Sequence, residues 1–333
     1  MVLCVSGQVM ALTQYNDGGT YDITTTINDD VWVDWQTPSM GTTVNLLGCG
    51  NIPHDYGMRA YEDSVINING GSLGASFLIH NRSQVDMSDG YINSSVAAYD
   101  DSQFSISGGS TGSMIYSYNN AEIDVFGGSI GQDVTAYDNS QVNVSDGTMG
   151  HVKSYGNTQT IISGGSMLGI YSYDSTHVSV SDGMINNISA FGSSQVNFSG
   201  GTLGHTLEVV ENSQVTFSGG LVQNRIVAEN DGILRIIGSD FAVDGTPVGY
   251  TELYSLLGGD WHSEPHRRLT GTLLSGEPID NEFYISYNAQ IVLTPEPATL
   301  LLLGLGSFMV RESLKKGRPD VSQKKRLHRL DAH

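Results

Sequence analysis

Carboxylates recur at regular positions in this 333-residue chain. Hydrolysis of a glycosidic bond uses two carboxylates that face the bond at a defined separation. The recurring acids are Glu62, Asp63, Asp100, Asp101, Asp138 and Asp174 at one part of the pattern, and Asp89, Asp146 and Asp182 at another. Asn, Ser or Gly takes the same positions elsewhere, and all of these residue types favour tight turns. Turn formation therefore explains the acids without catalysis, and we predict that the chain is not an enzyme.

Lyase or metal-dependent chemistry would need a base or a metal ion beside the acids. The basic residues inside the pattern are only Arg82, Lys153, Arg225 and Arg235. The calcium-binding pattern G-G-x-G-x-D is absent, and the similar stretch "GGSLGAS" at 70–76 also lacks the Asp. The nine histidines show no pair at metal-ligand spacing. We predict no catalytic residue, no metal site and no cofactor, and weak Ca²⁺ binding at the acidic positions stays open.

Aromatic residues form a second recurring column. Its tyrosines are Tyr99, Tyr118, Tyr137, Tyr155 and Tyr173. Pointing inward, such a column would pack as stacked rings in the core. Pointing outward, it would form an aromatic strip able to bind sugar rings. We favour the inward packing, because large aromatic side chains are more often buried than exposed.

Glycine sets the period that these columns share. A Gly closes each Gly-Gly or Asp-Gly pair, including Gly90, Gly109, Gly128 and Gly147, and nine such glycines follow one another at steps of 18 or 19 residues. A three-residue stretch of apolar, any and apolar residue, such as Val142 to Val144, lies at the same place in most repeats. Alternation with a period of two indicates strands, and Gly-Gly or Asp-Gly supplies the positive φ angles of sharp corners.

The repeat predicts an all-β fold, a capped parallel β-helix (β-solenoid) of 18–19-residue coils. Three short strands and three turns use up one repeat, so successive repeats would stack about 4.8 Å apart. We expect 1–11 to be a possible signal-peptide remnant, 12–65 the N-terminal cap and first coils, 66–240 the solenoid repeats, and 241–294 a C-terminal cap region. The caps would cover the exposed sheet edges at both ends.

Charge is divided unevenly along the chain. Residues 1–294 carry 31 acidic and 7 basic side chains, whereas residues 295–333 carry 4 acidic and 8 basic ones. An acidic body excludes nucleic acid as a partner, because phosphate binding needs a basic face. The two cysteines, Cys4 and Cys49, form no disulfide framework, although an exported protein could form a bridge between them. We favour a lone buried thiol at Cys49.

An apolar segment precedes the basic tail. It runs from residue 298 to 310, which is shorter than the roughly 20 residues of a membrane-spanning helix. With its flanks, "TPEPATLLLLGLGSFMVR" resembles the PEP-CTERM sorting signal of Gram-negative bacteria, through Pro295, Glu296, Pro297, Ala298, Thr299 and Arg311. The glycine-rich repeats also look like a solenoid type found in PEP-CTERM proteins.

That resemblance has implications for the export, sorting and processing of the protein. It implies a sorting signal over 295–311 with a short hydrophobic helix, followed by a basic tail over 312–333. It further implies export, transient inner-membrane anchoring and recognition by an exosortase-type processing enzyme, with final location in the outer envelope or extracellular matrix. The expected function is structural or adhesive, in association with exopolysaccharide. The alternative is a polysaccharide lyase or glycoside hydrolase on a parallel β-helix.

Overall fold

The structure is a computed structural model that describes residues 12–35, 40–250, 252–253 and 267–296. The chain divides into two compact units, Met1–Thr294 and Pro295–His333. Only Pro295 and Glu296 of the second unit are described, so the predicted C-terminal helix, the rest of the sorting signal and the basic tail lie outside the described residues. Among the described residues, no helix is long and apolar enough to cross a membrane.

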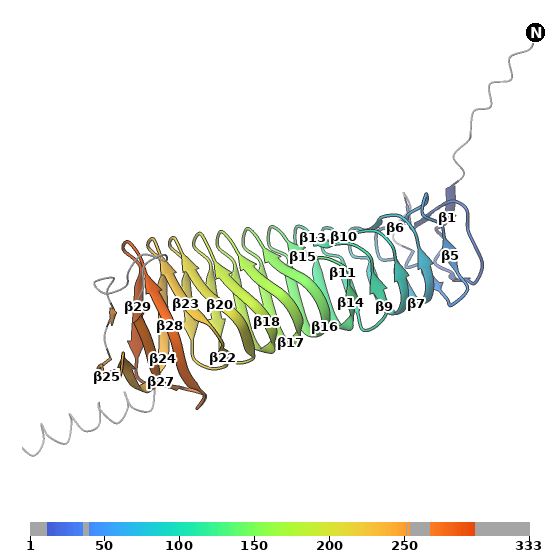
Figure 1. The fold of residues 1–333 in the computed structure, drawn as a ribbon. Helices are drawn as coiled ribbons and strands as arrows, with labels where there is room; N and C mark the ends of the chain where they lie inside the picture. Colours follow the sequence, from blue (N-terminus) through green and yellow to red (C-terminus); the bar gives the residue numbers. More distant parts are fainter. Residues whose placement is uncertain (1–11, 36–39, 251, 254–266, 297–333) are drawn as a thin grey trace, which may run out of the picture. The chain divides into compact units, whose positions relative to one another are not determined.

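The described part of the first unit is built from strands in stacked parallel coils (Figure 1). In chain order the strands are β1 (Leu12–Tyr15), β2 (Thr20–Ile23), β3 (Asp30–Val33), β4 (Thr43–Leu46), β5 (Asn51–Ile52), β6 (Met58–Ala60), β7 (Val65–Leu73), β8 (Phe77–Ile79), β9 (Gln84–Ile92), β10 (Val96–Ala98), β11 (Gln103–Ile106), β12 (Ser110–Thr111), β13 (Ile115–Ser117), β14 (Glu122–Ile130) and β15 (Val134–Ala136). They continue with β16 (Gln141–Ser154), β17 (Gln159–Ser172), β18 (His177–Ala190), β19 (Gln195–Phe198), β20 (Thr202–Val210), β21 (Gln214–Phe217), β22 (Leu221–Val222), β23 (Arg225–Glu229), β24 (Ile233–Val243), β25 (Thr246–Pro247), β26 (Glu252–Leu253), β27 (Arg267–Leu273), β28 (Pro278–Ile285) and β29 (Gln290–Thr294).

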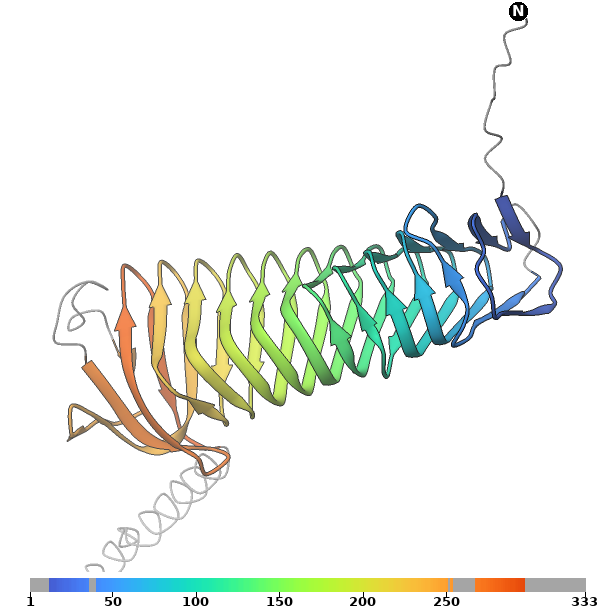
Figure 2. The same ribbon diagram turned by 45° about the vertical axis from the view of Figure 1, so that its right-hand side comes forward.

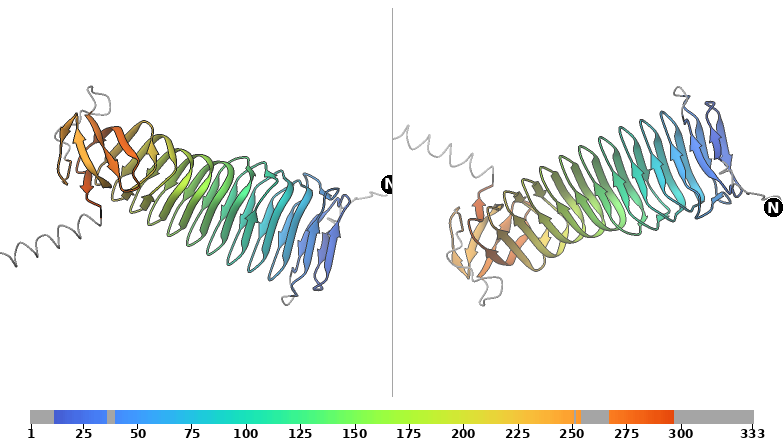
Figure 3. Two further views of the ribbon diagram at one scale, coloured as in Figure 1. Left: turned by 90° about the horizontal axis from the view of Figure 1, so that it is seen from below. Right: turned by 90° about the horizontal axis from the view of Figure 1, so that it is seen from above.

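Strand pairing confirms the predicted parallel repeat. Gln84 pairs with Gln103, and Gln141 pairs with Gln159, so the partners are one sequence repeat apart in both cases. Equivalent residues of successive coils therefore lie beside one another, as the turned views of Figures 2 and 3 also show for the coils between β7 and β24. The longest strands, β16, β17 and β18, pair with each other along most of their length.

The core is a column of apolar side chains inside the coils. Alternation along each strand places every second residue inward, as in β11, where Phe104 and Ile106 are buried while Gln103 and Ser105 are partly exposed. Phe198 and Phe217 stack in this interior with ring centroids 5.3 Å apart. Burial of apolar surface, at roughly 25 cal/mol per Å², is the main favourable contribution to folding.

Buried hydroxyls line one inner corner next to this apolar column. Nearly every coil places a Ser or Thr there with at most 1% exposure: Ser64, Ser83, Ser102, Ser140, Thr158, Thr176, Ser194 and Ser213. Some of these hydroxyls bond to backbone carbonyl oxygens, as Ser140 Oγ does to Tyr137 O at 2.7 Å. A buried hydroxyl costs free energy unless it is hydrogen-bonded. Three members of this series, Ser64, Thr158 and Thr176, have no partner for their hydroxyls among the described residues, so the fold bears that cost there.

Both ends of the stack depart from the regular repeat. At the N-terminal end the coils are longer than one repeat, since β3 pairs with β6 through Val31 and Met58. At the C-terminal end, β28 and β29 pair in parallel with β23 and β24, which lie far earlier in the chain. Part of the segment expected to be a cap, 241–294, thus forms one more coil, and β25, β26 and β27 are added by antiparallel pairing.

Cys49 differs from its expected placement. The prediction of a buried thiol is wrong, because Cys49 is an exposed free cysteine. It lies between two glycines, Gly48 and Gly50, in the turn that joins β4 to β5, and turns run along the surface.

The glycine corners allow the coils to approach closely. Gly109 has a φ of +72°, and a Cβ there would lie 2.7 Å from the carbonyl oxygen of Gly90 in the preceding coil. We expect Gly109→Ala to destabilise the protein by several kcal/mol, because left-handed strain of about 1–2 kcal/mol adds to a backbone clash. Urea unfolding followed by circular dichroism would measure the loss.

Gly245→Ala is the matched control. Gly245 has a similar φ of +76°, but no atom lies within 4 Å of a Cβ built there. This variant should lose only the strain contribution of about 1–2 kcal/mol. Equal losses in the two variants would show that close approach of the coils is not what requires glycine at position 109.

Candidate functional site

The recurring acids lie at the corner where one coil ends and the next begins, as between β10 and β11 or between β17 and β18. The first residue of this corner has a left-handed backbone, with φ of +55° at Glu62, +61° at Asn81 and +62° at Asp100. Asn and Asp adopt this conformation more readily than other residues that carry a side chain. The sequence pattern of Asp, Asn and Gly at this place therefore follows from the turn.

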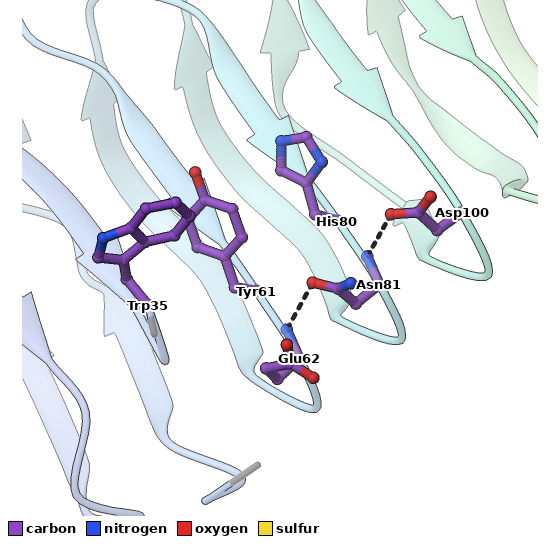
Figure 4. A pocket seen from close by; sticks show the side chains of 6 residues that line it. All are labelled: Trp35, Tyr61, Glu62, His80, Asn81 and Asp100. Carbon is purple, nitrogen blue, oxygen red and sulfur yellow. Dashed lines mark hydrogen bonds between the residues drawn. The ribbon is translucent and has the colours of Figure 1, made fainter. Parts of the chain in front are cut away.

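Hydrogen bonds link these corner residues from coil to coil, and we call the series the corner ladder. Its side chains belong to Asn81, Asp100, Asn119, Asp138, Asp174 and Glu211. Each accepts a hydrogen bond from the backbone N–H of the corner residue one coil earlier. Figure 4 shows two of these bonds, from the Glu62 N–H to Asn81 Oδ1 at 3.2 Å and from the Asn81 N–H to Asp100 Oδ2 at 3.0 Å. The corner acids are thus acceptors within the fold.

The other recurring acids also bond locally. Asp89, Asp146 and Asp182 each accept a hydrogen bond through Oδ1 from the N–H of the glycine that follows, at 2.7 Å in all three cases. At the second corner position, Arg82 forms an ion pair with Asp63, with Nε and Oδ1 2.7 Å apart, and the Asn120 amide donates to Asp101 at 2.9 Å.

The tyrosine column forms a stack of rings, which we call the ring ladder. It contains Tyr61, His80, Tyr99, Tyr118, Tyr137, Tyr155, Tyr173 and Phe191. Neighbouring ring centroids lie 4.6 to 5.2 Å apart, and the planes differ by 1 to 12°. This spacing is close to the distance between paired strands, so one ring covers the face of the next.

The ring ladder is half-buried and lies outside the buried apolar column. The rings stack as expected, but the inward direction is wrong. The residue before each ring, such as Ala98, Ala136 or Ser154, takes the inward position. Burial raises the pKa of Tyr118, Tyr137 and Tyr173, so these phenols stay protonated at neutral pH. The ladder therefore offers ring edges and hydroxyl groups to solvent, while its ring faces are covered by one another.

One cluster breaks the regular columns and was not foreseen from the sequence. Asp133 Oδ2 lies 2.7 Å from Lys153 Nζ, and Asp133 Oδ1 lies 2.9 Å from His151 Nδ1 and accepts the His151 backbone N–H at 2.8 Å. His151 and Lys153 lie about one coil after Asp133, so the repeat itself was the signal that could have found them. The Asp133 side chain is 12% exposed.

The charges of this cluster stabilise each other. Burial alone would raise the pKa of Asp133, but hydrogen bonds from Lys153 and His151 outweigh it and hold the pKa below its ordinary value. The hydrogen bond to Asp133 raises the pKa of Lys153. A lysine that acts as a general base needs the opposite shift, so this Lys is suited to an ion pair and not to proton abstraction.

A second pair of acids lies on β14. Burial and the nearby Asp124 raise the pKa of Glu122, against a hydrogen bond from Asn143 that lowers it. The Asn143 amide donates to Glu122 Oε1 at 3.0 Å and to Asp124 Oδ1 at 2.8 Å, and the Gln103 amide donates to Asp124 Oδ2 at 3.0 Å. Amides of the two adjacent coils thus bridge the carboxylates.

A cavity of about 390 Å³ opens where the ring ladder begins (Figure 4). Its lining residues are Trp35, Tyr61, Glu62, His80, Asn81 and Asp100. In the described part of the chain, no three His, Cys, Asp or Glu side chains are grouped so that they could hold a metal ion. Of the predicted sorting residues, Pro295 and Glu296 follow β29, whereas Pro297, Ala298, Thr299 and Arg311 lie outside the described residues.

Comparison with protein-family models, with curated proteins and with solved structures finds no match to this chain. The fold and the contacts described above are therefore the observations from which a function can be inferred.

The corner ladder makes a prediction about Asp100. Asp100→Ala removes the acceptor of the Asn81 N–H and the residue type that tolerates a left-handed backbone, so we expect a loss of about 1–3 kcal/mol in the free energy of unfolding. Asp100→Asn keeps both features and should be nearly neutral, as Asn is at the corners of the adjacent coils. Thermal unfolding of the two variants would test this. Equal destabilisation by Asn would show that the charge, and not the hydrogen bond, matters.

The cluster around Asp133 makes a prediction about pH. Because the pKa of Asp133 is lowered on folding, its contribution to stability is present above the unfolded value of about 3.9 and is lost as pH falls through the lower folded value. We expect Asp133→Asn to cost about 1–3 kcal/mol at pH 7. Urea unfolding of both proteins between pH 7 and pH 2 should show this difference shrink below about pH 4.

Asp86→Asn is the control for loss of one negative charge, because Asp86 is an exposed residue on β9. It should change stability by less than about 0.5 kcal/mol. A difference between wild type and Asp133→Asn that stays constant down to pH 2 would contradict the ion-pair assignment.

Proposed function

We propose that this chain is an exported, non-catalytic protein of the cell envelope or extracellular matrix, with a structural or adhesive role beside exopolysaccharide. Its solenoid serves as an acidic scaffold, and the C-terminal Pro-Glu-Pro segment directs its sorting and its processing by an exosortase-type enzyme after transient anchoring in the inner membrane. The resemblance of residues 294–311 to a PEP-CTERM signal supports the sorting part of the proposal.

The observation that carries the scaffold role is the engagement of the recurring polar residues in the fold. The corner acids accept hydrogen bonds from the preceding coil, the turn acids accept from the next glycine, and ring faces are covered by the next ring. Side chains used in this way stabilise a stack of coils. The strongly acidic body also keeps such a protein soluble among polyanions.

A polysaccharide lyase or glycoside hydrolase is the second candidate. The raised pKa of Glu122 beside Asp124 favours it, since a glycosidase pairs a protonated carboxyl with an ionised one. Against it, three of the four oxygens of this pair accept hydrogen bonds of 3.0 Å or less from Gln103 or Asn143. Those amides hold the two groups in the sheet.

The sorting proposal is tested by the termini of the native protein. We expect the protein recovered from envelope and culture-fluid fractions to begin near Leu12 and to end near Pro295, as measured by intact mass and terminal peptides. Replacing Pro295, Glu296 and Pro297 by Ala should leave the full chain in the membrane fraction, because the processing enzyme loses its recognition motif.

A matched control replaces Glu277 and Pro278 by Ala, a second Glu-Pro pair whose residues are both exposed. This variant should be processed like the wild type. Full-length protein ending at His333 in the cytosol would contradict export and sorting. Release of oligosaccharides from a panel of polysaccharides by the purified protein, and its loss in Glu122→Gln, would instead support the enzyme.

A further inference from the structure

The ring ladder ends at the cavity lined by Trp35 and Tyr61. Within the ladder, adjacent planes differ by at most 12°, so each face is covered. At the N-terminal end the next ring is Trp35, whose plane is tilted by 51° from that of Tyr61 with centroids 4.6 Å apart. Because the two planes are not parallel, the rings diverge on one side, and both Trp35 and Tyr61 line the cavity. At the other end the coil after Phe191 places the buried aliphatic Val210 in the column.

Polar groups of the corner ladder converge on the same cavity (Figure 4). The ladder uses Asn81 Oδ1 and Asp100 Oδ2 as acceptors. Among the described residues, this leaves the two amide hydrogens of Asn81, Asp100 Oδ1 and the Glu62 carboxylate for a ligand. The cavity therefore combines aromatic surface with both donors and acceptors of hydrogen bonds.

The charged groups around the cavity indicate which charge a ligand can carry. Glu62 and Asp100 line the cavity, and Asp101 follows Asp100 in the chain, so an anionic ligand is repelled. Asp63 adds little to this repulsion, because it is paired with Arg82. Burial lowers the pKa of His80, so at neutral pH its ring is uncharged and has one donor and one acceptor nitrogen. A small organic cation would use the rings and the carboxylates but not the amide donors of Asn81.

We propose that this cavity binds one unit of a neutral saccharide, with its apolar face against Trp35 and Tyr61 and its hydroxyls on Glu62, Asn81 and Asp100. A sugar ring has an apolar face and alternating hydroxyls that donate and accept, which matches the mixed lining. This proposal rests on the proposed role beside exopolysaccharide. It adds where the glycan would bind and that the bound unit would be uncharged.

Asn81→Asp tests the site without disturbing the fold. Aspartate keeps the acceptor oxygen of the corner ladder and tolerates the left-handed backbone, as Asp100 does in the next coil, but it replaces the amide donors by a carboxylate. Asn119→Asp is the matched control. Asn119 has the same backbone (φ +60°) and the same role in the ladder, two coils further along, and it does not line the cavity.

The experiment is calorimetric titration of the full chain with neutral hexasaccharides of glucose, galactose and N-acetylglucosamine, with a hexauronate and with tetramethylammonium chloride. We expect at least one neutral hexasaccharide to bind, with affinity reduced about tenfold or more in Asn81→Asp and unchanged in Asn119→Asp. Both variants should melt within a few degrees of the wild type.

Three results would overturn the assignment. They are no binding of any neutral sugar at millimolar concentration, equal or tighter binding of the hexauronate or of tetramethylammonium, and equal losses in the two variants. Each of these results leaves the mass of the exported protein unaffected. Failure of the saccharide site is therefore distinguishable from failure of the proposed sorting.

Discussion

In-register stacking of parallel strands is the constraint on which the rest of this structure depends. Because equivalent residues of successive coils pair with one another, each side chain has its own counterpart as neighbour at the spacing of a β-sheet. That spacing suits flat rings, which stack, and corner amides and carboxylates, which reach the backbone one coil earlier. A shift of register would bury the outward side chains and expose the core.

The same constraint indicates where function can reside. Residues that conform to a column have their contacts inside the column, whereas departures from it release groups for other partners. The tilted Trp35 interrupts the ring ladder, and Lys153 places a cation in an acidic body. The first of these lies at a cavity with polar groups that remain available. The second is satisfied by Asp133, which explains why a basic residue in the repeats does not by itself mark a site.

The glycine spacing was sufficient to predict the parallel coils, because sharp corners and short strands leave few other arrangements. The direction of the tyrosines was not predictable from composition, since it depends on which residue of a corner turns inward, and small neighbours such as Ala98 fit either choice. The coil formed by β28 and β29 was not predicted, because β28 pairs with β23 across a long stretch of intervening chain. No local sequence pattern indicates such a pairing. The cavity was missed because Trp35 lies before the regular repeat, so it belonged to no column.

The corner ladder also sets the order in which the corners of a growing chain can acquire their hydrogen bonds. In every bond of the ladder the backbone donor belongs to the earlier coil and the accepting side chain to the later one. A corner of a nascent chain is therefore completed only when the following coil has been made. If synthesis or translocation starts at the N-terminus, each new coil would supply the side-chain acceptor for the corner of the coil before it. At two corners the residue is a glycine, Gly156 or Gly192, which has no side chain to accept a hydrogen bond. The corner one coil earlier therefore lacks this bond.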